Sequence, residues 1–134
     1  MKTLFNKGES KAFTRLVSES DTASFDSGEV HHVLSTFALG RDAEWVCRLF
    51  VIDMIEEQEE GIGTSLNIKH ISPAFVGETI TYLAKFVHHQ GNTVMCSFCA
   101  KVGTRVVANG YTEQKIVNKE KINQLFKHYS GEGI

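Results

Sequence analysis

The strongest pattern of apolar and polar positions in the chain runs from Thr36 to Glu57. From residue 43 onward the apolar positions recur at alternating steps of three and one, which places them on one side of an α-helix of about four turns. They are Ala43, Val46, Cys47, Phe50, Val51, Met54 and Ile55. The opposite side is rich in charged residues, so the pattern predicts one long, half-buried helix.

Two glycines suggest where this helix begins and ends. Gly61 follows an acidic stretch and is a natural C-cap and stop signal. Gly40 permits a break near the other end, which would leave Thr36 on a preceding loop and start the helix near Arg41. Glu44 would then lie in the first turn, beside the apolar stripe, where its carboxylate is partly desolvated.

β-strand patterns dominate the rest of the chain. Residues 11–19 read as a first strand, and the polar, turn-rich residues 18–29 read as a surface loop. Four β-rich segments follow the helix, and tight turns join the last three into an expected antiparallel meander. They span residues 64–71, 79–89, 93–102 and 105–117. A short, charged helix with Ile122, Leu125 and Phe126 on one side is expected over residues 118–129.

This order of elements predicts an α+β fold, with residues 1–134 forming a single domain. Long consecutive strands around one helix suggest a curved antiparallel sheet wrapped around one long central helix. Such a sheet leaves edge strands unpaired, and pairing between two copies is the usual remedy. A homodimer or higher homo-oligomer is therefore expected.

Composition narrows the class of protein. The chain has 134 residues, 42% of them hydrophobic and 22% charged, as in ordinary globular proteins. A net charge of −2 shows no basic excess, which argues against a nucleic-acid partner. The sequence contains no apolar run of membrane-spanning length, and its first residues lack the apolar core of a signal peptide. We expect a cytoplasmic protein with no membrane partner.

The cysteines suggest neither a disulfide framework nor a metal site. Cys47 lies on the apolar side of the helix, and all three cysteines are expected to be reduced. Cys96 and Cys99 are three residues apart, which on a strand directs their side chains to opposite faces. No bound metal or cofactor is therefore expected.

Thr36, Glu44 and His70 are the candidates for chemistry. A carboxylate early in a helix, an imidazole from a neighbouring strand and a hydroxyl can together activate a water molecule, and helix N-terminal amides can stabilise an oxyanion. In one continuous helix, however, Thr36 and Glu44 would be separated by about 12 Å of rise and roughly 80°. The residues alone leave structural alternatives open: Thr36 as a helix cap, Glu44 as a favourable charge at the helix start, and His70 bonded to a carbonyl.

Several residue types at matched spacing resemble the hotdog-fold thioesterases, and within them the fluoroacetyl-CoA thioesterase-like family. The resemblance covers about residues 8–117 and is strongest between residues 36 and 77. Its matching positions are Thr36, Glu44-Trp45-Val46-Cys47, Gly63-Thr64, His70, Pro73 and Gly77.

The resemblance implies a hotdog fold and hydrolysis of a short acyl-CoA thioester to free acid and CoA, at a site on the dimer interface. Glu44 would be the base or nucleophile, His70 would assist as acid and base, and Thr36 would position Glu44 or the attacking water. Gly63 would let the acyl group or the thioester approach the backbone. No cofactor is implied, because coenzyme A is part of the substrate.

Two departures from that family concern the acyl group. A substrate-contacting Arg of the fluoroacetyl enzyme corresponds here to Gln114, and its aromatic-rich lid corresponds to a stretch with Phe25 and the His31-His32 pair. These departures leave open whether fluoroacetyl-CoA itself is a substrate. Two other functions are compatible with the fold: a non-catalytic acyl-CoA-binding sensor, and a hotdog-fold hydratase that uses Asp42 with His70.

Overall fold

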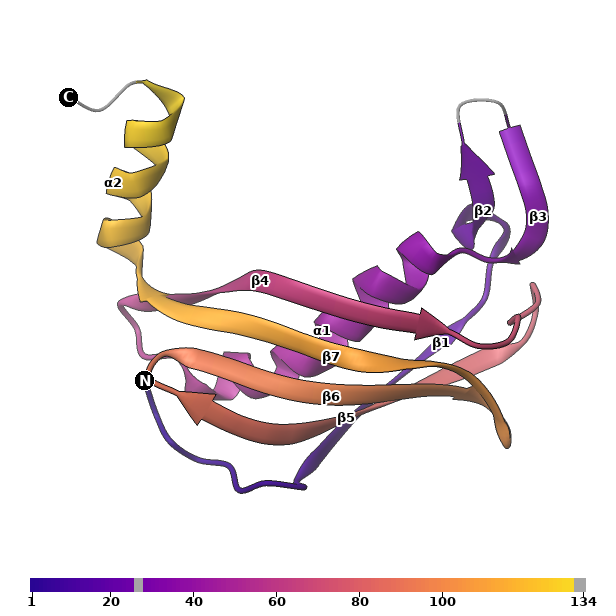
Figure 1. Ribbon diagram of the computed structural model, residues 1–134, viewed down its shortest axis with the longest axis horizontal. Helices are drawn as coiled ribbons and strands as arrows, with labels where there is room; N and C mark the ends of the chain where they lie inside the picture. Colours follow the sequence, from indigo (N-terminus) through magenta and orange to yellow (C-terminus); the bar gives the residue numbers. More distant parts are fainter. Residues whose placement is uncertain (26–27, 132–134) are drawn as a thin grey trace.

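A five-stranded antiparallel sheet with one long helix on one face dominates the computed structural model, which describes residues 1–25 and 28–131 (Figure 1). The strand order is β1-β5-β6-β7-β4, and a separate two-stranded sheet pairs β2 with β3. The predicted α+β architecture, a sheet curved around a central helix, is confirmed. The elements are β1 (Ser10–Leu16), η1 (Glu19–Asp21), β2 (Thr22–Phe25), β3 (Gly28–Leu34), α1 (Thr36–Met54), β4 (Glu59–His70), β5 (Thr79–Gln90), β6 (Thr93–Val102), β7 (Arg105–Asn118) and α2 (Lys119–Ser130).

Helix α1 begins at Thr36 and runs without a break through Gly40, so the expected loop before residue 41 is wrong. Ser35 is its N-cap and accepts a hydrogen bond from the amide of Ala38. Gly40 serves close packing instead of a break, because a Cβ there would lie 3.1 Å from Cδ2 of Leu66 on β4. Strand β4 can therefore pass close to the first turns of the helix.

The expected helix end at Gly61 is also wrong. The helix stops at Met54, and Ile55 caps it in an extended conformation. Gly61 lies within β4 and is buried, and a Cβ there would collide with the side chain of Val51. Its lack of a side chain therefore lets β4 pack against α1, and the acidic stretch before it forms a turn and the start of β4.

The three-stranded meander β5-β6-β7 is confirmed, with each strand antiparallel to the next. Alternate residues of β5 and β6 are buried against α1, as the period of a half-buried strand requires. Cys96 is buried on this inner side while Cys99 lies on the other face, in agreement with their odd spacing. All three cysteines are free thiols in the structure.

The expected surface loop over residues 18–29 is wrong as well. Most of it forms the 3₁₀ turn η1 and the strands β2 and β3, which pair as a hairpin; residues 26–27 lie outside the described part. Main-chain bonds hold the base of the hairpin, from the amide of Ser35 to the carbonyl of Asp21 and from the amide of Leu34 to the carbonyl of Ala74. The predicted first strand accordingly ends at Leu16.

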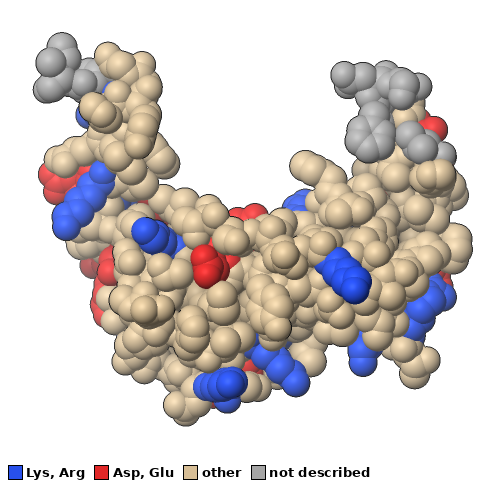
Figure 2. All heavy atoms as spheres, in the orientation of Figure 1, with Lys and Arg blue, Asp and Glu red and all other residues tan. Residues whose placement is uncertain are grey.

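Helix α2 and the β2–β3 hairpin project on the same side of the molecule, beyond strand β4 (Figure 1). The space-filling view shows the notch that they leave between them (Figure 2). Asn118 caps α2 through its side chain, and Gly131 ends the helix with a φ of 80°. None of the described helices is long and apolar enough to cross a membrane.

Candidate active site

Helix α1 and strand β4 bring Glu44 against Gly63. The half-buried carboxylate of Glu44 lies directly over Gly63, where a Cβ would collide with Oε1 and lie 3.1 Å from Cδ of Glu44. Glycine at position 63 therefore makes room for the catalytic candidate itself. This differs from the sequence expectation, in which the space over Gly63 was reserved for substrate.

The second part of the site is a hydrogen bond between Thr36 and His70. Oγ1 of Thr36, at the first residue of α1, lies 3.0 Å from Nδ1 of His70 at the end of β4. Thr36 is exposed and His70 is half-buried. The family resemblance implied that Thr36 positions Glu44 or the attacking water; in the structure its hydroxyl is bonded to the imidazole of His70.

Thr36 and Glu44 line one hollow of about 460 Å³ beside α1. Its apolar walls include Phe37 of the helix and Leu66 and Ile68 of β4. The two polar residues are two turns apart on a continuous helix, so they do not hold one atom together. The structure thus brings together Thr36 and His70 at one end, and Glu44 and Gly63 at the other.

Gln114 of β7 lies beneath this site. It is directly opposite Gly63 across the β4–β7 pair and its side chain is buried. Its amide nitrogen donates a long bond of 3.4 Å to the main-chain oxygen of Glu44, while its Oε1 has no partner among the described residues. Contact between Gln114 and substrate remains a prediction, and the observed contact is with the backbone of α1.

An ionic cluster next to the site was not anticipated from the sequence. Asp42 is buried and bonds both Arg15 at 2.9 Å and Arg41 at 3.0 Å, and Arg41 also bonds Asp21 at 3.0 Å. Burial alone would raise the pKa of Asp21, but hydrogen bonds from Arg41 and Ser18 outweigh it and hold that pKa below its usual value. Arg41 and Asp42 are neighbours in the sequence, but only tertiary folding brings Arg15 and Asp21 to them.

The cluster argues against the hydratase alternative. Asp42 is fully engaged by Arg15 and Arg41, while His70 is bonded to Thr36. The structure therefore does not bring Asp42 and His70 together as an acid–base pair.

Comparison with known families decides the class of this protein. Residues 17–120 match the model of the FlK family, described as fluoroacetyl-CoA-specific thioesterase. The chain belongs to the FlK family. It is thus a member of a family of thioester hydrolases, and the family resemblance read from the sequence is confirmed. No curated protein sequence matches the chain significantly.

Solved structures show the fold of the FlK family over nearly the whole chain. A thioesterase superfamily member from Thermus thermophilus is 28% identical, with a TM-score of 0.90, over 94% of this chain and 93% of that one. A point mutant of FlK is 22% identical, with a TM-score of 0.86, over 96% of this chain and 99% of that one. A hot-dog-like protein from Thermanaerovibrio acidaminovorans is 21% identical, with a TM-score of 0.85, over 93% of each chain. The predicted hotdog fold is confirmed.

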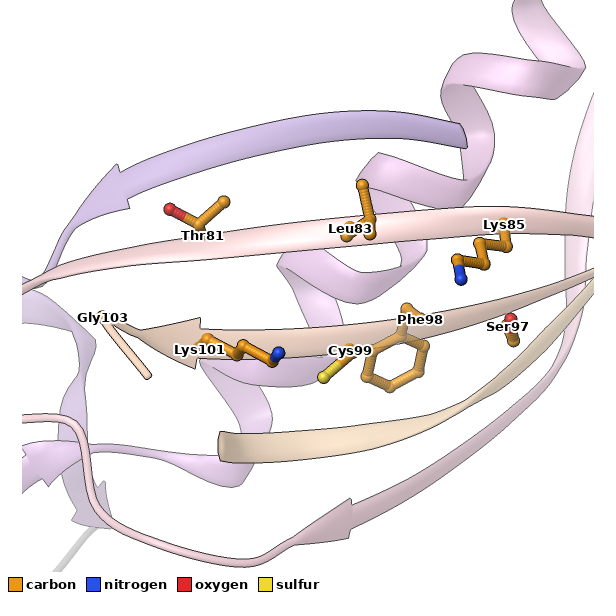
Figure 3. A pocket seen from close by; sticks show the side chains of 8 residues that line it. All are labelled: Thr81, Leu83, Lys85, Ser97, Phe98, Cys99, Lys101 and Gly103. Carbon is orange, nitrogen blue, oxygen red and sulfur yellow. The ribbon is translucent and has the colours of Figure 1, made fainter. Parts of the chain in front are cut away.

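A second hollow of this FlK-family chain lies on the outer face of the sheet. It measures about 610 Å³ and is lined by side chains of β5 and β6, among them Lys85, Cys99 and Lys101 (Figure 3). Helix α1 packs on the opposite face, so Thr36, Glu44 and His70 do not border it. This outer hollow has no part in the candidate site.

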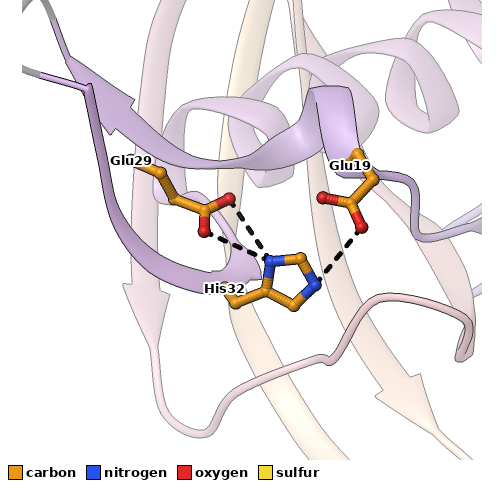
Figure 4. Close-up of side chains that lie close together, drawn as sticks. All are labelled: Glu19, Glu29 and His32. Atoms are coloured by element: carbon orange, nitrogen blue, oxygen red, sulfur yellow. Dashed lines mark hydrogen bonds and ion pairs between the residues drawn. The ribbon is translucent and has the colours of Figure 1, made fainter.

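Three exposed side chains near the hairpin have residue types that could bind a metal. In the structure His32 bridges two carboxylates, with Nδ1 3.2 Å from Glu29 and Nε2 3.4 Å from Glu19 (Figure 4). Hydrogen bonds from Thr22 and His32 lower the pKa of Glu29. The imidazole lies between the two carboxylates, so the arrangement is a bridge that ties η1 to β3.

Proposed function

We propose that this chain hydrolyses a short acyl-CoA thioester, with Glu44, His70 and Thr36 as the reacting and positioning groups. One observation carries the proposal: the Thr36–His70 hydrogen bond and the Glu44 carboxylate lie at the two ends of one hollow beside α1. Family membership supports the reaction class. The FlK structures support the substrate class, since one of them holds fluoroacetate with CoA and another holds acetyl-CoA.

The proposed role of His70 takes the hydroxyl of Thr36 as the donor in their bond. A hydroxyl that donates to Nδ1 leaves the proton of the neutral imidazole on Nε2. That N–H can protonate the thiolate of CoA as it leaves. Thr36 is then a positioning residue, which fixes both the orientation and the tautomer of His70.

Glu44 supplies the base or the nucleophile at the other end of the hollow. Its carboxylate either takes a proton from water as the water attacks the thioester carbonyl, or attacks the carbonyl itself to form an anhydride that water then cleaves. In both routes the products are the free acid and CoA. The amides of the first turn of α1 carry partial positive charge, which can stabilise the oxyanion.

A homodimer formed through β4 is part of the proposal. Strand β4 is an edge of the five-stranded sheet, and residues 63–67 in its middle are exposed. Unpaired edge strands favour pairing with a second copy. Because β4 also carries Gly63 and His70, such pairing would place each site at the subunit interface.

The substrate is expected to have a short and uncharged acyl group. The hollow has apolar walls in Phe37, Leu66 and Ile68, and Gln114 places a neutral amide below Glu44. Arg41 also lines the hollow, but its charge is paired with Asp42 and Asp21. A buried neutral amide gives an anionic acyl group no compensating charge. Acetyl and other short aliphatic thioesters fit these properties.

The test is release of free thiol from a panel of acyl-CoAs of increasing length and from fluoroacetyl-CoA. We expect the highest kcat/KM for short aliphatic members, and a loss of roughly 10²–10⁴-fold in His70→Ala. His88→Ala, at an exposed histidine of β5, is the matched control and should keep the wild-type rate. Absence of hydrolysis with every member would overturn the proposal, and a rise in melting temperature with one of them would then indicate a sensor.

A further inference from the structure

Helix α2 carries an apolar face that the described residues leave largely uncovered. Ile122 packs against the body of the molecule, but Leu125, Phe126 and Tyr129 are 45%, 56% and 80% exposed. Their spacing of three, one and three places all four residues on one side of the helix. The helix is nevertheless well anchored, since Asn118 caps it and the amide of Lys119 donates to the carbonyl of Gln58. A well-anchored helix with an exposed apolar face is typical of a protein–protein contact surface.

The location of α2 relative to β4 limits which part of the protein its apolar face can contact. Asn118, the cap of α2, is paired with Glu59 at the start of β4. The hairpin, the start of α1 and His70 lie at the other end of the same strand. Twelve residues of β4 separate the two ends by roughly 40 Å, so α2 cannot reach the Thr36–His70 end of its own chain's site.

A second copy paired along β4 would remove this separation. An antiparallel pair of identical strands has a two-fold axis near its middle, which exchanges the two ends of the strand. The axis therefore places α2 of one chain beside the hairpin and the start of α1 of the other, on both sides of the dimer. The two projections that flank the notch in Figure 2 become neighbours from different chains.

We propose that α2 acts in trans: its apolar face packs over the partner's hairpin and the start of the partner's α1, and so closes the partner's acyl site. The inference rests on the proposed function, because the hollow that α2 covers is the one beside Thr36. The occupant of the notch is a second copy of this chain. Each site is then incomplete without the C-terminal helix of the other subunit.

The surface at the hairpin end fits α2 in both polarity and charge. A hollow of about 720 Å³ lies between the hairpin and the start of α1, and Phe37 on its rim is 87% exposed. Glu19 and Glu29 are exposed nearby. The apolar face of α2 matches Phe37, and lysines flank that face on α2 to match the two carboxylates. These lysines are Lys119 and Lys121.

Closure by α2 would also limit the acyl group. The apolar walls of the hollow within one chain are Phe37, Leu66 and Ile68, and Phe37 and Leu66 are exposed. Phe126 and Leu125 from the partner would add the missing apolar wall. Shortening this wall is then expected to admit longer acyl chains.

The first test is cross-linking, which does not depend on catalysis. Phe37→Cys and Phe126→Cys are placed in separate chains that also carry Cys99→Ser, which removes the one native thiol that is not buried. Co-expressed with different tags, the two chains should form a covalent heterodimer on mild oxidation or with a short bis-maleimide. Each variant alone should not, because the two-fold axis holds like residues at opposite ends of β4. Absence of the heterodimer, or equal cross-linking of either variant alone, would overturn the proposal.

The second test is complementation of activity between two defective chains. Phe126→Ala keeps the chain's own Glu44 but removes apolar surface from α2. Glu44→Gln keeps α2 intact but removes the carboxylate. Action in trans predicts that mixed dimers regain about a quarter of the wild-type activity at equal mixing, since half of the dimers are mixed and each has one complete site. No recovery, or full activity of Phe126→Ala alone, would contradict closure by α2. A wild-type chain without hydrolytic activity would defeat the proposed function and leave the cross-linking result to stand by itself.

Discussion

Gly63→Ala tests how the site is built, because one methyl group acts directly on the catalytic candidate. A Cβ at position 63 collides with Oε1 of Glu44 and lies 3.1 Å from its Cδ. The obstacle is the far end of a flexible side chain, so Glu44 can turn away into another rotamer at a cost of about 0.5–1.5 kcal/mol. Alanine also fits a strand better than glycine by about 0.5–1 kcal/mol, which offsets most of that cost.

The fold should therefore survive while the geometry of catalysis does not. Displacing a catalytic group by about 1 Å can lower the rate on the order of 100-fold. We expect kcat of Gly63→Ala to fall by that order, with a melting temperature close to that of the wild type. The assay is steady-state thiol release from acetyl-CoA, with thermal unfolding followed by circular dichroism on the same preparations.

Gly61→Ala provides the matched control on the same strand. Its Cβ would collide with Val51, a core residue, so it should lower stability by about 1–3 kcal/mol through overpacking. The folded fraction should keep its activity at low temperature, because Glu44 is not displaced. A wild-type kcat in Gly63→Ala, or a rate loss that only follows unfolding in both variants, would refute the placement of the carboxylate over Gly63.

Three further predictions concern other parts of the structure. Thr36→Ser should keep the bond to His70 and nearly all of kcat, whereas Thr36→Val should lose roughly 2–13-fold, the value of one hydrogen bond of about 0.5–1.5 kcal/mol, measured in the same thiol assay. Asp21→Asn should flatten the acid side of the pH–stability profile measured by urea unfolding. The pKa of Asp21 is lowered in the folded state, so its contribution to the free energy of unfolding is present above its ordinary pKa of 3.8 and is lost as the pH falls through the lowered pKa. Gly110→Ala should destabilise the protein by several kcal/mol, roughly 3 or more, in chemical denaturation, because its Cβ would overlap the main-chain carbonyl of Asn67 and no side chain can yield there. A Gly110→Ala protein with a normal unfolding midpoint would show that β4 and β7 lie farther apart than described.

The sequence predicted the elements whose pattern is set by local period. The apolar stripe from Ala43 to Met54 is the buried side of α1, and the segments at 79–89, 93–102 and 105–117 are strands β5 to β7. In both cases one face is buried over many residues, so the period survives in the sequence.

The glycines show what local pattern could not supply. Gly40 and Gly61 look like a break and a stop, yet both are sites where β4 and α1 approach each other. A glycine that permits a turn and one that permits close packing have the same local signal, and the neighbour that decides between them is distant in sequence. The hairpin at residues 22–34 was missed for a similar reason, since main-chain bonds to distant residues such as Ala74 help to hold it.

For the candidate site, too, the sequence predicted the residue types but not the contacts between distant residues. Residue types and a family resemblance pointed to Thr36, Glu44 and His70, but the bond between Thr36 and His70 was not predicted and depends on the uninterrupted helix. The ionic cluster around Asp42 draws on Arg15 of β1 and on Arg41 of the same helix. Contacts across elements of this kind carry no spacing rule that a single sequence could reveal.

The measurement that tests the central claim most directly is thiol release from acetyl-CoA by the wild-type chain and by Glu44→Gln, at equal concentration and matched folded fraction. The account predicts turnover by the wild type and a loss of roughly 10²–10⁴-fold in the variant, since glutamine fills the same space without serving as a base or nucleophile. Equal rates in the two proteins would show that Glu44 does not carry the reaction and would contradict the proposed mechanism.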